Sequence, residues 1–447
     1  MTDTLIRPRL RTVTLRGVRP LGSPPLDVTL HDGRIAAITA PGTGTSTGPG
    51  IDCEGLIMLP AFVDLHTHLR EPGGEDTETI ATGTRAAAHG GYSDVFAMAN
   101  CRPVTDTPDR VRHIAQTAAR TASCRVHPVG AITTGLAGAQ LAPLKEMAGA
   151  GARMFSDDGK CVDNAAILQA ALRIGRRTGT VIAQHAQCGH LAGQGQVNAG
   201  EAADHTGLPP WPATGEETIV ARDVVLAAAT GAHLHICHVS TAGTADIVRW
   251  AKQRGWPVTA EVTPHHLLLT DTLTLGTDPT YKVNPPLRTA DDVAALRAAL
   301  LDGTIDAVAT DHAPHSDASK AEDWCHAPFG MTGLETALPI VAKVLSGDSD
   351  REPDWGLIAD VMSHRPARIG SIADRAGRPL RPGEPATFTL IDPRADWRVD
   401  AEAGTSKSRN TPFHGLRLRH RVIATVLDGR ITADPAHLLT GGSHDHG

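Results

Sequence analysis

The sequence predicts an α/β protein, a (β/α)8 TIM-like barrel with a small β-sandwich domain formed from the N- and C-terminal segments. Three observations lead to this prediction. Short apolar runs alternate with Ala-rich helical stretches through the middle of the chain. Strand-like segments occupy both ends. Residues suited to metal binding recur where the apolar runs stop, which is where (β/α)8 barrels build their active sites.

Both ends of the chain are predicted to form short strands joined by turns. Alternating or apolar runs are bounded by turn residues such as Asp32-Gly33 and Asp428-Gly429. Strands are expected at 11–16, 26–30, 34–38, 386–391 and 422–427. We therefore predict one small β-domain made of residues 1–57 together with 370–435, and a polar C-terminal tail at 436–447.

Residues 58–369 are predicted to form the barrel, because apolar runs and helical patterns alternate there. Its strands are expected at 58–65, 93–99, 126–131, 152–155, 181–184, 233–239, 258–262 and 305–310. Helices are expected between them at 79–88, 164–177, 217–229, 244–254 and 290–301. The stretch 190–212 is rich in Gly, Ala and Pro and is predicted to be a long loop.

The composition is typical of a globular enzyme and argues against several other classes of protein. Hydrophobic residues make up 41% of the 447 residues, and the net charge of −7 disfavours non-specific nucleic-acid binding. No apolar run reaches 18 residues, so no membrane span is expected. Residues 1–10 lack the apolar core of a signal peptide, and the seven cysteines lack CxxC spacing. We expect a cytoplasmic protein with reduced thiols.

Histidines and aspartates follow five of the predicted strands. His66 and His68 share one face of a strand, so both imidazoles can approach one ion. The other candidates are Asp157 or Asp158 after the fourth strand, His185 after the fifth, His238 after the sixth and Asp311 after the eighth. Each has an ordinary alternative, such as a turn aspartate or a hydrogen-bonded core histidine. Taken jointly, four histidines and two aspartates predict a site for two divalent cations, Zn²⁺ first and Mn²⁺ or Co²⁺ as alternatives.

Longer motifs surround these candidates. They are DLHTHLREPG at 64–73, FSDDG at 155–159, HVS at 238–240, KVNPPLR at 282–288, TDHAPH at 310–315, PFG at 328–330 and SKSRNTPF at 406–413. Together they resemble the class I dihydroorotases of the amidohydrolase superfamily over nearly the whole chain. The motif after the second strand departs from the family's usual Met-Pro-Asn-Thr, because it reads Met98-Ala99-Asn100-Cys101. Asn100 is kept, so only the shape of the local loop is in doubt.

The resemblance implies a role for each metal-site candidate. His66 and His68 would hold the first cation with Asp311, and His185 and His238 would hold the second. Asp158, rather than Asp157, would bridge both cations, because the family's spacing to the next histidine then fits His185. Many relatives use a carbamylated lysine as the bridge, whereas the class I pattern has aspartate. Lys160 lies beyond the Gly159 turn, so we do not expect it to take that part.

The resemblance also implies the substrate contacts. Arg70 would pair with a carboxylate through its planar fork. Asn100 and His315 would complete that pocket, with His68 beside it. Asn284 and the backbone at Phe329 and Gly330 would meet the amide edge of a ring. The polar segment 317–326 is expected to be either a lid or an ordinary solvated loop.

The implied activity is that of a dihydroorotase. It interconverts (S)-dihydroorotate and N-carbamoyl-L-aspartate in de novo pyrimidine (UMP) biosynthesis, by a metal-bridging hydroxide with Asp311 as the proton shuttle. A hydantoinase, dihydropyrimidinase or allantoinase is the nearest alternative, and Asp158 and Arg70 disfavour it. A non-catalytic scaffold for aspartate transcarbamoylase is the alternative from another class, and the complete ligand set disfavours it. A homo-oligomer is expected, and binding of that transferase by a catalytic chain is left open.

Overall fold

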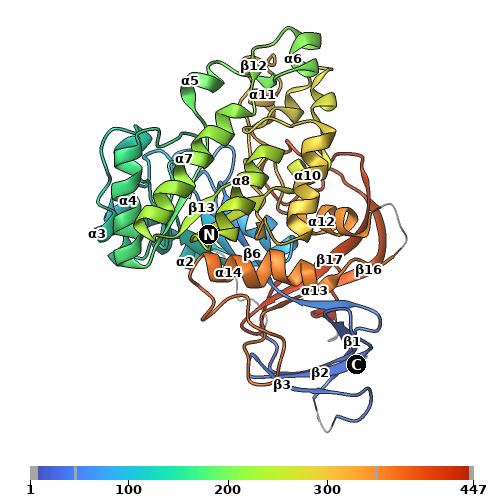
Figure 1. Cartoon of the computed structure of the whole chain (residues 1–447). Helices are drawn as coiled ribbons and strands as arrows, with labels where there is room; N and C mark the ends of the chain where they lie inside the picture. The colour runs from blue at the N-terminus through green and yellow to red at the C-terminus, as the bar shows by residue number, and fades with distance from the viewer. Residues whose placement is uncertain (1–8, 45–47, 348–350, 442–447) are drawn as a thin grey trace.

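The computed structural model describes residues 9–44, 48–347 and 351–441. The predictions for residues 1–8 and for tail residues 442–447 therefore lie outside the described residues. A strand-rich part built from the first and last segments lies beside a larger part of helices and strands (Figure 1). The structure is thus α/β, as the sequence predicted.

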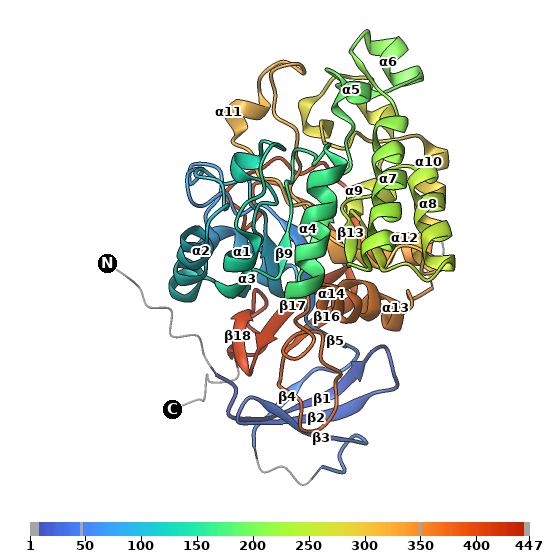
Figure 2. The same ribbon diagram turned by 60° about the vertical axis from the view of Figure 1, so that its left-hand side comes forward.

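The strand-rich part is one sheet assembled from both ends of the chain, in the order β18-β17-β16-β5-β1-β2-β3, with β4 paired to β1. Its N-terminal strands are β1 (Thr12–Pro20), β2 (Leu26–His31), β3 (Arg34–Thr39), β4 (Gly50–Asp52) and β5 (Ile57–Pro60). Its C-terminal strands are β16 (Phe388–Arg398), β17 (Arg417–Leu427) and β18 (Arg430–Ala433). Val28 and Leu30 from one end share an apolar core with Phe388 and Leu390 from the other. The two ends are therefore held together by buried apolar surface as well as by strand pairing (Figure 2).

The apolar run 58–65 was predicted as a single strand, and this was wrong. Strand β5 pairs with β1 and β16 in the terminal sheet, whereas β6 (Phe62–Thr67) begins two residues later and pairs with β7. Every residue of both strands is buried, so hydrophobicity alone does not show where one sheet ends and the next begins.

Eight parallel strands lie in the larger part. Strands β6, β7 (Tyr92–Ala97) and β8 (Arg125–Pro128) form one group. The other group is β9 (Met154–Phe155), β10 (Val181–Gln184), β13 (Leu234–Ile236), β14 (Val258–Val262) and β15 (Ala307–Val308). Isolated parallel bridges join Gly130 to Phe155 and Thr67 to His312, and so connect both edges of one group to the other. Because the strands are parallel, their carboxyl ends point to the same side of the molecule.

Most of the helices follow these strands and pack outside them (Figure 2). They are α1 (Ile80–His89), α2 (Pro108–Thr121), α3 (Leu144–Gly149), α4 (Ala165–Thr178), α7 (Thr214–Thr230), α8 (Ala242–Gln253), α10 (Ala290–Leu301), α12 (Ala337–Ser346), α13 (Trp355–Ala359) and α14 (Arg365–Ile369). Local capping fixes several of their ends. The Asn164 side chain caps α4, which ends at Gly179 in a left-handed conformation, and Thr289 forms a capping box with Asp292 on α10. Within the described ranges, every helix is too short or too polar to span a membrane.

The stretch 190–212 is not the unstructured loop that was predicted. It holds α5 (Gly189–Ala192), α6 (Glu201–Thr206), and strands β11 (Val197–Asn198) and β12 (Pro210–Trp211), which pair with each other. These elements are shorter than the windows over which a hydrophobic period can be recognised. Trp211 from this excursion packs edge-on against Phe329, with the ring centres 5.8 Å apart.

Candidate metal centre

The six metal-ligand candidates meet at the carboxyl ends of the parallel strands. His66 lies at the end of β6 and His68 just beyond it, and both face Asp311, which follows β15. Oδ1 of Asp311 lies 3.0 Å from Nε2 of His68 and 3.5 Å from Nε2 of His66. All three side chains are buried. Residues 66 and 311 are far apart in the sequence, so it is the strand arrangement that brings them together.

Asp158 is the centre of the cluster. Its carboxylate oxygens lie 3.0 Å from His66, 3.4 Å from His68, 3.5 Å from His185 and 3.7 Å from His238, measured to the nearest ring nitrogens. One carboxylate within reach of all four imidazoles is the arrangement expected of a bridging ligand. The neighbouring Asp157 faces elsewhere, because its carboxylate accepts hydrogen bonds from the backbone of residues 132 and 133.

The outer ring nitrogens of three histidines are held by oxygen atoms, which leaves the inner nitrogens facing Asp158. His66 donates from Nδ1 to Glu261 at 2.9 Å, His68 donates from Nδ1 to Asn100 at 2.9 Å, and His185 donates from Nε2 to Gln187 at 2.9 Å. Such contacts fix the tautomer and ring orientation of metal-binding histidines. The inner nitrogens are then available as electron-pair donors.

These residues could hold divalent cations. His66, His68 and Asp311 form one group whose ligand atoms lie within 4.8 Å of one another, and His66, Asp158 and His238 form a second. Nε2 of His66 is buried without a hydrogen-bond partner, although it faces two carboxylates. A buried polar atom without a partner is costly, and a bound cation would satisfy it. Imidazole nitrogen and carboxylate oxygen are ligands that suit Zn²⁺ and related ions.

The pKa shifts of His66 and Asp158 also indicate a site for cations. Burial opposes a charge on His66, yet the carboxylates of Asp158 and Asp311 hold its pKa well above the ordinary value. Burial likewise opposes ionisation of Asp158, and the neighbouring histidines, His66 foremost, keep its pKa well below the usual range. The buried carboxylates thus require positive charge beside them, which bound cations would supply.

Glu261 was missed by the sequence analysis although it belongs to this site. It lies on β14, where it accepts hydrogen bonds from His66 Nδ1 and from His235 Nε2 at 3.0 Å. His235 also contacts Thr259, so both of its ring nitrogens have partners and it is a structural histidine. The signal that could have found Glu261 is a lone acidic residue inside an apolar strand, which is costly to bury without a partner.

Three site residues have a backbone conformation that is uncommon outside glycine. The φ angles of Arg70, His238 and Asp311 are +59°, +31° and +46°. Residues with positive φ cost free energy, and they concentrate at active sites that the surrounding structure holds in place. The strand ends therefore turn sharply where their side chains must enter the cluster.

The predicted substrate residues lie on loops next to the cluster. Nε2 of His315 donates to the Phe329 carbonyl at 2.8 Å, and Nη2 of Arg70 lies 3.3 Å from the same nitrogen. Burial lowers the pKa of His315 to about 3, with the charge of Arg70 adding to the effect. A neutral His315 and the Arg70 cation thus lie side by side next to the cluster.

Two of the predicted substrate residues have hydrogen-bond partners within the protein. Asn100 bonds within the cluster, since it accepts from His68 and donates to Asp158 Oδ2 at 3.1 Å. Asn284 donates to Gln187 at 3.1 Å, and its Oδ1 atom is buried without a partner. Asn100 thus orients metal-ligand candidates, whereas Asn284 keeps an acceptor open. Gln187, which contacts both His185 and Asn284, was not found from the sequence.

The segment 317–326, expected to be a lid or a solvated loop, is fastened at both of its ends. It contains α11 (Asp317–Lys320), and Nζ of Lys320 donates to the Pro279 carbonyl at 2.8 Å. Nζ of Lys282 donates to the carbonyls of Trp324 and Ala327 at 2.6 and 2.7 Å. Both lysines are buried. The polar composition of the segment 317–326 did not indicate that these two lysines would anchor it.

Comparison with known proteins agrees with this geometry. Residues 55–244 match the protein family described as Dihydro-orotase-like. A dihydroorotase from Streptomyces coelicolor is 50% identical over 420 residues, which cover 94% of this chain and 97% of that protein. A dihydroorotase from Mycobacterium tuberculosis is 48% identical over 425 residues, covering 94% and 98%.

Among solved structures, an L-hydantoinase (dihydropyrimidinase) from Arthrobacter aurescens has a TM-score of 0.83 at 24% identity, over 95% of this chain and 96% of that one. This likeness shows the fold alone. The relatives at 48–50% identity match along nearly their whole length and so show the family. The chain belongs to the dihydroorotase family.

Proposed function

We propose that this chain catalyses the reversible hydrolysis of (S)-dihydroorotate to N-carbamoyl-L-aspartate, a step of de novo pyrimidine biosynthesis. The observation that carries the proposal is the meeting of four histidines around Asp158 and Asp311, next to the half-buried Arg70. The cluster of histidines and aspartates suits metal-assisted opening of an amide ring, and the arginine suits a substrate with a carboxylate. The high identity to dihydroorotases supports the same reaction.

Substrate recognition follows from the charges beside the cluster. Dihydroorotate carries a carboxylate on a flat cyclic imide. Arg70 supplies the charge and the planar fork that pair with a carboxylate, and His315, 3.3 Å from Arg70, would complete the wall of that pocket. The open Oδ1 acceptor of Asn284 suits a ring N–H. The backbone of Phe329 and Gly330 borders the same space.

The chain's own residues would also manage the protons. Hydrolysis adds water across the ring C–N bond, so one proton must pass from the attacking water to the leaving ring nitrogen. Asp311 is the residue we assign to this transfer, because its carboxylate is buried within the cluster and lies 3.0 Å from His68. In the direction of synthesis Asp311 would return the proton as the ring closes and water leaves.

The first cation would be held by His66, His68 and Asp311, the second by His185 and His238, with Asp158 between them. When bound, the cations would polarise the amide carbonyl and lower the pKa of the attacking water. Zn²⁺ is the ion we propose, on the grounds of the mixed nitrogen and oxygen donors.

We also propose an architecture and an assembly for this chain. The isolated bridges at Gly130–Phe155 and Thr67–His312 favour closure of the eight parallel strands into a (β/α)8 barrel. We propose that the chain divides into a terminal β-domain and a barrel, with the bounds predicted from the sequence. We also keep the expectation of a homo-oligomer, with aspartate transcarbamoylase as a candidate partner.

A substrate panel tests the activity. The purified chain is assayed with dihydroorotate, hydantoin, dihydrouracil and allantoin under identical conditions. We expect hydrolysis of dihydroorotate well above the other three, because only dihydroorotate carries the carboxylate that Arg70 would bind. Preference for a neutral ring would instead make the chain a different cyclic amidohydrolase, and inactivity on all four substrates would favour a non-catalytic scaffold.

A further inference from the structure

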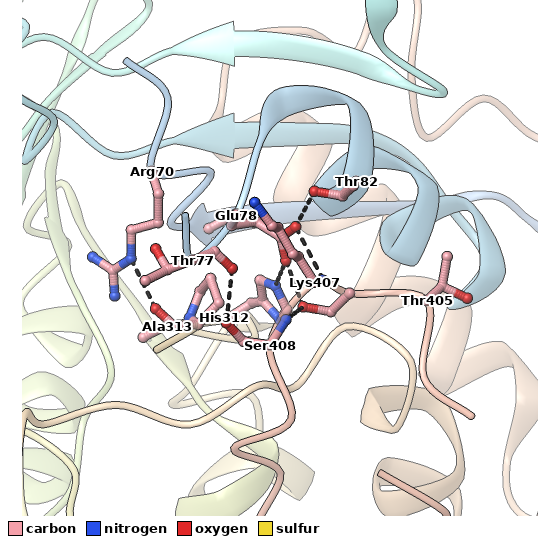
Figure 3. Close-up of polar contacts among 12 residues, drawn as sticks. Arg70, Thr77, Glu78, Thr82, His312, Ala313, Thr405, Lys407 and Ser408 are labelled. Atoms are coloured by element: carbon pink, nitrogen blue, oxygen red, sulfur yellow. Dashed lines mark hydrogen bonds and ion pairs between the residues drawn. The ribbon is translucent and has the colours of Figure 1, made fainter. Parts of the chain in front are cut away.

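The segment 405–410 comes from the C-terminal part of the chain, yet it is bonded to loops beside the metal centre. Ser406 donates from its hydroxyl to Glu78, whose other carboxylate oxygen accepts from the Lys407 backbone at 3.3 Å. Ser408 donates to the Thr77 carbonyl at 2.7 Å. Figure 3 shows Glu78 between this segment and His312, whose Nε2 atom lies 3.4 Å away. The segment 405–410 is therefore fixed to the loop that precedes α1.

Asn410 is the residue of this segment that reaches the substrate loops. Its Nδ2 atom donates to the Ala313 carbonyl at 3.0 Å and to the Gly330 carbonyl at 3.1 Å, and its Oδ1 atom accepts from the His315 backbone at 3.1 Å. The side chain is buried. Turning the amide over would set its oxygen against two carbonyls and its NH₂ against an N–H group. The three partners therefore determine its orientation.

The two loops that Asn410 joins are packed closely at this point. Gly330 has φ of +144°, and a Cβ atom added there would lie 2.7 Å from Nε2 of His315. The same nitrogen donates to the carbonyl of Phe329 at 2.8 Å. The two loops are thus in direct contact at this point. The Asn410 side chain bonds to both loops at the place where the substrate's carboxylate and ring edge are proposed to bind.

We propose that Asn410 is a positioning residue for substrate binding, which holds the loops of His315 and of Phe329–Gly330 at the separation that dihydroorotate requires. The inference rests on the proposed function. All three side-chain bonds of Asn410 go to backbone atoms of these loops, and none goes to the six metal-ligand candidates. Asn410 therefore acts on the affinity for substrate and leaves the affinity for cations unchanged.

Steady-state kinetics of two variants test this assignment. Asn410→Ala removes all three bonds, whereas Asn410→Asp keeps the size and the acceptor for His315 but loses both donors. We expect KM for dihydroorotate to rise at least about tenfold in each variant, since small displacements of binding groups are costly. The kcat and the bound metal should stay close to those of the wild type. The matched control is Ser408→Ala, which removes one part-buried bond from the same segment without touching the loops of His315 or of Phe329–Gly330; its KM should not change.

Each other outcome overturns the inference in a recognisable way. An active wild type with unchanged KM in both Asn410 variants would remove the positioning role and leave the proposed function standing. If kcat and the bound metal fell while KM rose in the Asn410 variants, Asn410 would have a general structural role. An equal rise of KM in Ser408→Ala would show the same. A wild type that does not hydrolyse dihydroorotate would overturn the proposed function first, and this inference with it.

Discussion

The side chains of His66 and Glu261 are joined by a buried hydrogen bond, with 2.9 Å between Nδ1 and Oε1. Burial would raise the pKa of Glu261, but His235 and His66 on either side lower it to about 2. Glu261 is therefore an anion at neutral pH, and it keeps the proton of His66 on Nδ1. A cation that replaces the proton favoured on Nε2 by Asp158 and Asp311 would then bind the lone pair of that nitrogen.

Glu261→Gln should weaken metal binding without touching a proposed ligand. The variant loses the charge that orients His66, and such outer contacts typically contribute about 10- to 100-fold to metal affinity. Competition with a chelating dye would measure the effect. Glu146→Gln, at an exposed position on α3, is the control. Equal metal affinity in Glu261→Gln and the wild type would contradict the role given to Glu261.

Asp311→Asn should separate metal binding from turnover. The amide keeps an oxygen beside His68 but accepts a proton far less readily, so most of the metal should remain. Because positioned proton transfer contributes about 100-fold or more, kcat should fall at least about 100-fold. Metal content and kcat are measured on the same preparation. Turnover near the wild-type rate would remove Asp311 from the proton transfer.

Arg70→Met should raise KM for dihydroorotate more than it lowers kcat. Hydrogen bonds to a charged group contribute about 1.5–3 kcal/mol, so the expected rise is about 10- to 100-fold. Arg70→Lys keeps the charge but loses the planar fork, and its KM should lie between those of the other two proteins. An unchanged KM in Arg70→Met would exclude a carboxylate contact at this position.

Lys320 should make the stability of the protein depend on pH above neutrality. Burial, with the charge of Lys282 adding to it, lowers the pKa of Lys320 from 10.5 to about 7. From about pH 7 upward the unfolded chain binds a proton that the folded chain lacks, so the free energy of unfolding gains a contribution that rises with pH. Below about pH 7 both states bind the proton and the cost of burial is constant.

Thermal unfolding across this range tests the prediction. The Tm of the wild type relative to Lys320→Met should rise between about pH 7 and about pH 9.5. Lys145→Met, at an exposed site, is the matched control. A Tm difference that stays constant over the range would show that Lys320 is not buried as an uncharged amine.

The sequence was most informative where a signal is local. Strands 181–184 and 258–262 and the helix at 290–301 agree with β10, β14 and α10 at both ends, because each has a compact apolar or capped pattern. The division between β5 and β6 could not be seen, since both strands are fully buried and differ only in their pairing partners.

In the candidate site, too, the residues with a local sequence signal were predicted and those that depend on distant partners were not. Its metal-ligand candidates stand at predicted strand ends, and family motifs mark them. Glu261, Gln187 and Asn410 were not assigned, because their roles depend on which side chain or backbone atom lies opposite them in three dimensions. Several of these contacts link residues far apart in the sequence, as between Asn410 and Ala313. A hydrophobic period carries no information about them.

The most direct test of the central claim is a metal titration of the metal-depleted protein followed by the rate of dihydroorotate hydrolysis. Zn²⁺, with Mn²⁺ and Co²⁺ in parallel, is added in steps, and the rate is plotted against metal per chain. If His66, His68, Asp158, His185, His238 and Asp311 hold two cations, activity should be absent at first and reach its plateau at two equivalents. Full activity in the metal-free protein, or a plateau at one equivalent, would contradict the two-cation site.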